Sequence, residues 1–215
     1  MIPHTAMVLA AGLGTRMRPL TNDRCKALVT VGGKTLIDHN LDRLVAAGVK
    51  RAVVNVHAFA DLLEAHLQRR TDIEIVISDE RAKLMETGGG IRQARPLLGE
   101  DPIIVCNIDS VWEEWNGSAI ARLAYSYNPA KCDTKLMLAS MDQCLGFDGA
   151  GDFFMDEGGK LTFRDDAPST PWAYMGVYIT DPKIVDGEPL EPFSMTRVWR
   201  KLAASGRLHG APLGG

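Results

Sequence analysis

The chain has 215 residues, with 24 Lys and Arg against 27 Asp and Glu, which gives a formal net charge of −3. Hydrophobic residues make up 46% and charged residues 24%, a balance that excludes a disordered chain and predicts a single domain over residues 1–215. The weak negative charge creates no general attraction to nucleic acid or to anionic membranes, so we expect neither as a partner.

Targeting and cysteine patterns are equally plain. The sequence has no run of about 18 apolar residues that could span a bilayer, and its first residues lack the basic and apolar regions of a secretory signal. Its cysteines and histidines are widely spaced, without a CxxC pair. We therefore expect neither a disulfide framework nor a zinc site, and we place the protein in the cytoplasm. The sequence does not indicate an oligomeric state.

Two hydrophobic periods alternate along the first two thirds of the chain. Short apolar or β-branched runs predict strands at 5–10, 52–56, 73–77, 103–108 and 135–139. Apolar residues at helical spacing predict helices at 36–47, 60–67, 91–98 and 119–127. Strands that alternate with helices are typical of parallel βαβ units, so the predicted fold class is α/β with a doubly wound, mostly parallel sheet.

The pattern changes after about residue 140. Residues 146–159 are rich in Gly and Asp, and short strands are predicted at 160–164 and 174–180 around a loop that contains proline. A last helix is expected at 194–204. These features predict an irregular, partly antiparallel C-terminal third that forms one wall of a site.

The loop after the first strand combines glycines with positive charge. Ligands of such sheets bind outside the carboxyl ends of the strands, which directs attention to the loops after residues 10, 77 and 108. Gly12 and Gly14 permit the backbone to wrap closely around a phosphate. Between residues 12 and 34 a single acid, Asp23, is set against five cations, namely Arg16, Arg18, Arg24, Lys26 and Lys34. Glycines and cations together favour a polyphosphate cradle over a solvated basic loop.

Two better-known phosphate motifs do not match. A dinucleotide fingerprint that starts at Gly12 requires a third glycine where Met17 stands. A P-loop that ends in Gly33, Lys34 and Thr35 requires a glycine where Leu28 stands. A nicotinamide-dependent oxidoreductase is therefore disfavoured.

Three segments carry a resemblance to a known family. LAAGLGTRMRPLT at 9–21, CKAL at 25–28 and VGGKTLI at 31–37 resemble the signature of the sugar-1-phosphate nucleotidylyltransferases. The chain is most similar to the short bacterial N-acetylmuramate-1-phosphate uridylyltransferases and mannose-1-phosphate guanylyltransferases, above all over residues 7–112. The resemblance implies a Rossmann-like nucleotide-diphospho-sugar transferase fold.

The resemblance also implies an activity. Such enzymes transfer a nucleotidyl group from a nucleoside triphosphate to a sugar 1-phosphate and release pyrophosphate, so these two substrates are the expected partners. We expect UTP with N-acetylmuramate 1-phosphate, with GTP and mannose 1-phosphate as the alternative. A regulator that binds nucleotide sugars without catalysis is the rival from another class.

The matching positions carry expected roles. Arg16 matches the family arginine that holds the β- and γ-phosphates, and Lys26 matches the lysine that bridges the α-phosphate and the sugar phosphate, although Cys25 and Ala27 replace its flanking prolines. Three glycines at 88–90 would let a planar base stack against bare backbone. The residues expected to bind the nucleotide are Leu9, Ala11, Gly12, Gly14, Thr15 and Gly88.

The metal and sugar sites follow the later strands. Asp109 ends a buried apolar strand, where a carboxylate requires a cationic partner, and it matches the family's first ligand of Mg²⁺, the expected cofactor. The residues expected to bind the sugar are Asn107, Gly146, Tyr174 and Gly176.

One family motif has no counterpart in the sequence. Relatives end this domain with an aromatic–x–Asp–x–Gly–Thr turn whose Asp is the second metal ligand, and these 215 residues contain no such motif. We therefore expect the domain to lack its last strand and second metal ligand, and to retain nucleotide binding while metal affinity and turnover fall.

Overall fold

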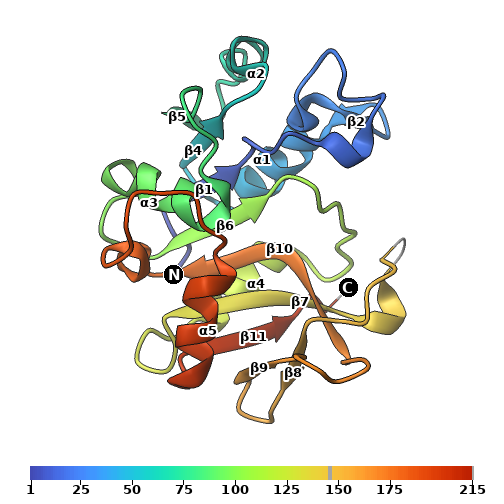
Figure 1. Ribbon diagram of the computed structural model, residues 1–215, viewed down its shortest axis with the longest axis vertical. Helices are drawn as coiled ribbons and strands as arrows, with labels where there is room; N and C mark the ends of the chain where they lie inside the picture. Colours follow the sequence, from blue (N-terminus) through green and yellow to red (C-terminus); the bar gives the residue numbers. More distant parts are fainter. Residues whose placement is uncertain (145–146, 215) are drawn as a thin grey trace.

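A mixed β-sheet organises the molecule (Figure 1). The computed structural model describes residues 1–144 and 147–214. Within these residues the main path of the sheet runs through β11 (Leu208–Pro212), β7 (Thr134–Ser140), β10 (Trp172–Thr180), β6 (Ile103–Asn107), β1 (Thr5–Leu9), β4 (Arg51–Val56) and β5 (Glu74–Asp79). A hairpin of β8 (Phe153–Met155) and β9 (Leu161–Phe163) is attached to β10, and β2 (Thr30–Val31) pairs separately with β3 (Lys34–Thr35).

Strand direction confirms the predicted fold class. β1 lies parallel to both β4 and β6, and β4 lies parallel to β5. β10 is antiparallel to β6 and to β7, while β11 is parallel to β7. The sheet is therefore mostly parallel, with antiparallel pairing in the C-terminal third, as expected.

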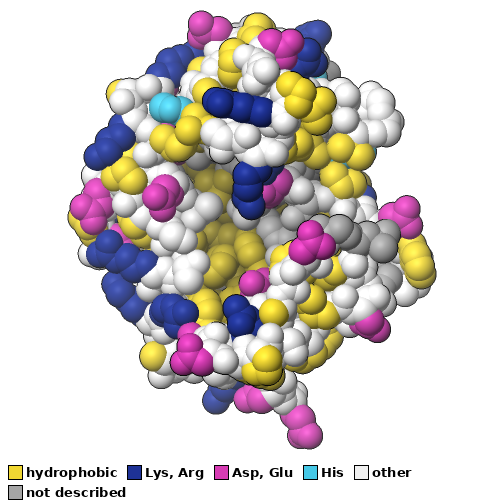
Figure 2. Space-filling view, turned by 45° about the vertical axis from the view of Figure 1, so that its right-hand side comes forward, with side chains coloured by type: hydrophobic (Ala, Val, Ile, Leu, Met, Phe, Trp, Pro, Cys, Tyr) yellow, Lys and Arg dark blue, Asp and Glu magenta, His cyan; other side chains and the backbone are white. Residues whose placement is uncertain are grey.

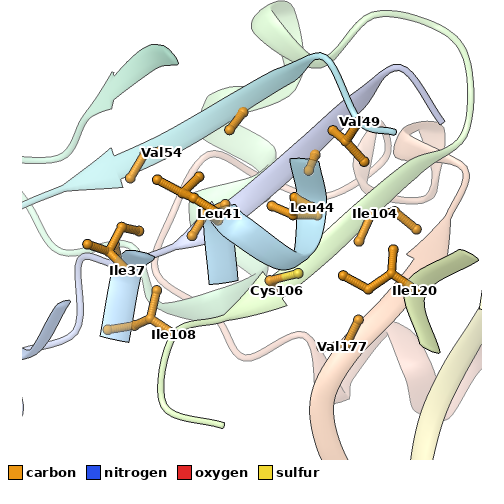
Figure 3. Close-up of a cluster of buried hydrophobic side chains, with 14 of the residues drawn as sticks. Ile37, Leu41, Leu44, Val49, Val54, Ile104, Cys106, Ile108, Ile120 and Val177 are labelled. Carbon is orange, nitrogen blue, oxygen red and sulfur yellow. The ribbon is translucent and has the colours of Figure 1, made fainter. Parts of the chain in front are cut away.

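Helices cover both faces of the sheet. Side chains of α1 (Leu36–Ala47), α2 (Ala60–Leu67) and α4 (Ala119–Ser126) pack in one hydrophobic cluster, and those of α3 (Glu86–Leu98) and α5 (Thr196–Ala204) in another. Along β1, Val8 points into the first cluster and Met7 into the second. Figure 3 shows Leu41 and Leu44 of α1 lying over the sheet in the first cluster. Strands buried on both faces explain the uninterrupted apolar runs of the sequence.

α1 and α2 have the predicted bounds, and α1 is capped at both ends. In α1, Thr35 Oγ1 accepts a hydrogen bond from the Asp38 N–H (3.2 Å), and Gly48 ends the helix with a positive φ of 99°. α3 begins at Glu86, five residues before the predicted start, and so includes the glycines at 88–90. β8 and β11 were not predicted: β8 has only three residues, and β11 contains a glycine and a proline within its five residues.

No helix among the described residues has the length and apolar character needed to cross a membrane.

Candidate active site

A cavity of about 190 Å³ lies at the carboxyl ends of the parallel strands. The loops after β1, β5 and β6 meet there, as expected for a doubly wound sheet. Figure 2 shows a hollow with a hydrophobic floor in the middle of one face, with charged side chains around its edges. The lining residues are Leu9, Ala11, Gly12, Lys26, Asn55, Leu84, Glu86, Thr87, Asn107, Ile108 and Asp109.

A larger and more open hollow, of about 610 Å³, lies beside α2 and the start of β5. Lys50, Gln68 and Asp72 are among the residues that line it. It lies at the amino end of the parallel strands, where the topology does not create a binding crevice, so the smaller cavity is the better candidate.

Lys26 and Asp109 form an ion pair in the candidate cavity. Lys26 Nζ lies 2.6 Å from Asp109 Oδ2, and the two side chains are 16% and 45% exposed. The sequence places Arg16, Lys26 and Asp109 around a triphosphate. Of these, Lys26 and Asp109 meet, although they are 83 residues apart in the chain. The cavity therefore contains a cation, Lys26, that can bind an anion, and a carboxylate, Asp109, that can bind a cation, and the two are in direct contact.

The backbone around Lys26 is anchored by its neighbours. Cys25 and Ala27 are buried in the α1 side of the core, so Lys26 is directed away from that core. Lys26 begins a 3-10 turn in which the Leu28 N–H donates to the Cys25 carbonyl oxygen (3.0 Å). The buried Cys25 and Ala27 thus fix the backbone on either side of Lys26, where relatives have prolines.

Gly14 has a specific structural reason to be glycine. Its φ is +62°, and a Cβ there would lie 3.0 Å from Lys26 Cβ and from Thr21 Cγ2. The absent side chain therefore lets the loop turn closely against Lys26. Thr15 and Arg16 follow on an exposed 3-10 turn. Neither is among the described residues that line the cavity. Their phosphate roles remain predictions.

The predicted base-binding segment divides into an open part and a packed part. Glu86 and Thr87 line the cavity, and Glu86 has an exposed side chain on a backbone with a positive φ of 61°. Such a conformation is strained for a residue other than glycine and is commonly found at functional sites.

Gly88 lies behind this open part, where its N–H donates to the Phe193 carbonyl oxygen (2.8 Å). A Cβ on Gly88 would lie 2.2 Å from the Phe193 ring, and a Cβ on Gly89 would lie 2.3 Å from the Glu191 carbonyl oxygen. The bare backbone that we expected to face a base thus faces a ring of the protein itself. A contact between Gly88 and the nucleotide remains a prediction.

On the predicted sugar side, Asn107 lines the cavity, and its buried Oδ1 has no hydrogen-bond partner among the described residues. Gly176 has a φ of +83°, and a Cβ there would lie 2.7 Å from Ser110 Oγ and 3.3 Å from Asn107 Cβ. Gly176 therefore lets β10 approach the loop that carries Asp109. Gly146 lies outside the described residues.

Two aromatic residues on this side contact other side chains of the protein, and the sugar-binding role of Tyr174 remains a prediction. The Tyr174 ring packs edge-on against Trp199 (4.9 Å between centroids), and burial raises the pKa of its hydroxyl well above the usual value. Trp112, near Asp109, is buried, and the Arg43 guanidinium lies 4.4 Å from its ring centroid. Its position is that of a core residue.

Asp109 fits a metal that is bound mainly through the substrate. Among the described residues no three His, Cys, Asp or Glu side chains are grouped so that they could hold a metal ion. Mg²⁺ commonly uses one or two carboxylates together with phosphate oxygens and water. The half-exposed Asp109 carboxylate matches that arrangement.

Sequence reasoning missed two polar residues of this region. Asn55, the last residue but one of β4, lines the cavity, and Glu80 follows β5 directly; both are buried. The sequence did contain a signal for them. Both are polar residues at the carboxyl end of a buried parallel strand, which is the reason that Asp109 was chosen as a site residue.

Comparison with known proteins shows to which class this fold and cavity belong. A family model described as nucleotidyl transferase matches residues 5–141. The N-acetylmuramate alpha-1-phosphate uridylyltransferase of Caulobacter vibrioides is 55% identical to this chain, over 99% of the chain and 90% of that enzyme. The mannose-1-phosphate guanylyltransferase catalytic subunit beta of Xenopus tropicalis is 38% identical over 49% of this chain and 31% of that protein.

Solved structures show the same fold at low sequence identity. The inositol-1-phosphate CTP transferase from T. maritima has a TM-score of 0.83 and 17% identity, over 99% of this chain and 86% of that one. A UDP-glucose pyrophosphorylase complexed with UDP-glucose has a TM-score of 0.78 and 19% identity, over 99% and 90%.

The chain belongs to the nucleotidyl transferase family. It is a nucleotidyltransferase, and the family resemblance seen in its sequence is confirmed.

The packing of the glycine run gives a stability prediction. In Gly89→Ala the new Cβ would meet the Glu191 carbonyl oxygen, so backbone must move. We expect the free energy of unfolding, measured by denaturant titration, to fall by about 1–3 kcal/mol. Gly187→Ala is the matched control, because its Cβ would have no atom within 4 Å. Equal stability of the two variants would contradict this account of α3.

Proposed function

We propose that this enzyme transfers the uridylyl group of UTP to N-acetylmuramate 1-phosphate and releases pyrophosphate. The observation that carries the proposal is the 55% identity to the Caulobacter vibrioides enzyme, which extends over nearly the whole chain. GTP with mannose 1-phosphate is the second candidate, supported by the 38% identity over half of the chain.

The proposed reaction joins two anions. A phosphate oxygen of the sugar 1-phosphate attacks the α-phosphorus of UTP, and the bond from that phosphorus to the pyrophosphate oxygen breaks. Lys26 Nζ is suited to hold the α-phosphate and the incoming phosphate together, because it is a cation that lines the cavity and is held in place by Asp109. Arg16, which lies on the adjoining exposed turn, would hold the β- and γ-phosphates.

The remaining groups position the substrates. We propose Asp109 as the carboxylate that holds Mg²⁺, which when bound would neutralise phosphate charge. The backbone of Ala11 and Gly12 borders the cavity and would carry the base and ribose. Asn107, Tyr174 and Gly176 remain the proposed sugar side, with the free Asn107 Oδ1 available to accept a hydrogen bond from a hydroxyl or amide.

The Glu86 carboxylate can accept hydrogen bonds from the N–H groups of a base. An ionised carboxylate only accepts hydrogen bonds. Uracil presents an N–H at position 3, guanine presents N–H groups at positions 1 and 2, and cytosine presents an amino group at position 4. The exposed carboxylate at the cavity is thus compatible with UTP and with GTP.

The cytoplasm remains the predicted location of the enzyme.

A ligand panel tests the proposed substrates. The melting temperature would be measured with each of the four ribonucleoside triphosphates and Mg²⁺, and pyrophosphate release with each sugar 1-phosphate. We expect UTP, the proposed substrate, to give the largest shift. A ligand at 100 times its Kd adds about 2.7 kcal/mol of stability, which is readily measured as a higher melting temperature. Release should require N-acetylmuramate 1-phosphate. A preference for GTP with mannose 1-phosphate would support the second candidate, and binding without release would support a regulator.

Replacement of Lys26 tests the catalytic assignment. We expect Lys26→Ala to lower kcat by roughly 10²–10³-fold, because a fixed charge that meets the reacting phosphates is lost. Lys50→Ala removes an exposed lysine at the amino end of β4 and serves as the control. Circular dichroism would confirm that both variants are folded. Normal turnover in Lys26→Ala would remove Lys26 from the mechanism.

Replacement of Glu86 tests base recognition. Glu86→Gly keeps the positive φ accessible but removes the carboxylate, and loss of a hydrogen bond to a charged group is worth about 1.5–3 kcal/mol. We therefore expect KM for UTP to rise roughly 10–100-fold. Glu86→Gln retains an acceptor oxygen and should have a smaller effect. An unchanged KM in both variants would show that Glu86 does not contact the base.

A further inference from the structure

Two buried side chains outside the expected site residues connect the loops of the cavity. Asn55 is 2% exposed and Glu80 is 1% exposed. Asn55 belongs to β4, and Glu80 is the residue directly after β5, so each lies at the carboxyl end of a strand. Buried polar groups of this kind are stable only when their hydrogen bonds are made.

Four hydrogen bonds form a continuous chain through this pair. The N–H groups of Ala10 and Ala11 donate to Asn55 Oδ1 at 2.6 and 3.1 Å. Asn55 Nδ2 donates to Glu80 Oε1 at 2.7 Å. Glu80 Oε2 accepts from the Met85 N–H at 3.0 Å. The loop after β1 is thereby joined to the segment before α3.

α3 packs closely against this chain of hydrogen bonds. A Cβ on Gly90 would lie 2.8 Å from Glu80 Oε1 and 3.0 Å from Asn55 Nδ2, so glycine makes room for the pair. Burial raises the pKa of the Glu80 carboxyl, which shows that the environment opposes its charge. A carboxylate retained at such a position requires its specific donors.

We propose that Asn55 and Glu80 are positioning residues for the nucleotide: they fix the backbone of Ala10 and Ala11 relative to Met85 and Glu86. The inference rests on the nucleotide site proposed above. The Asn55 oxygen and one of its N–H groups are committed to protein partners, as are both Glu80 oxygens. The pair therefore acts through the loops that border the cavity. Since small misplacements of bound reactants are costly, the pair should govern nucleotide binding more than sugar binding.

A charge swap within the pair tests this inference. Asn55→Asp sets two carboxylates against each other, and Glu80→Gln sets two amide N–H groups against each other, or turns one toward the Met85 N–H. In the double variant all four hydrogen bonds can form again. The new Asp would accept from Ala10 and Ala11, and the new Gln would donate to it and accept from Met85.

We expect each single variant to raise KM for UTP at least 10-fold and the double variant to restore it to within about threefold of the wild type. KM for the sugar phosphate, measured at saturating UTP, should change little in all three. Thr134→Val is the control, because it removes a buried 2.7 Å hydrogen bond to Thr180 away from the cavity. It should lower the melting temperature without changing KM for UTP.

The outcomes separate this inference from the proposed function. Folded single variants with wild-type KM for UTP would overturn it, as would a folded double variant that still binds UTP weakly. If the single variants do not fold, restored UTP affinity in the double variant supports the inference. If the wild type uses GTP instead of UTP, the proposed substrate fails, while the same variants still test the positioning role with GTP.

Discussion

Burial of the parallel strands on both faces is the constraint on which the site depends. In β1 and β6 successive side chains enter opposite hydrophobic clusters, so neither strand can carry a charged group along its length. Polar groups are therefore confined to the strand ends. Because β1, β4, β5 and β6 run in the same direction, their carboxyl ends lie along one edge, where Asn55 and Glu80 bond to each other and Asp109 pairs with Lys26.

Charge at this edge is held in two different ways. Lys26 and Asp109 are partly exposed and form a direct ion pair, so each remains accessible to groups in the cavity. Glu80 is fully buried and is satisfied by amide and backbone donors. The first arrangement leaves charge accessible at the cavity, whereas in the second the charge is bonded to neighbouring backbone and amide groups. The same edge thus contains both the groups that we propose to bind the substrates and the groups that hold their backbone.

The fold was largely predictable from the sequence, and the site only in part. Helices 36–47 and 60–67 were placed correctly because they show clear periodicity and α1 has good caps. β11 was missed because its pairing with β7 depends on a contact that no local pattern encodes. The closeness of Lys26 and Asp109 was expected from the family resemblance and from the rule that ligands bind at the carboxyl ends of parallel strands, whereas their direct ion pair was not. The packing of Gly88 against Phe193 could not be foreseen, because it joins residues more than a hundred positions apart.

The contact between the glycine run and residues 191–193 has a consequence for the way such enzymes diversify. The Gly88 and Gly89 N–H groups donate to the Phe193 carbonyl oxygen, and the Phe193 ring fills the space beside Gly88. The segment that borders the cavity and the segment that leads into α5 have complementary shapes. A chimera that exchanges the C-terminal third with that of a relative must therefore bring a matching partner for these glycines. A change in either segment alone would leave the other without its packing partner.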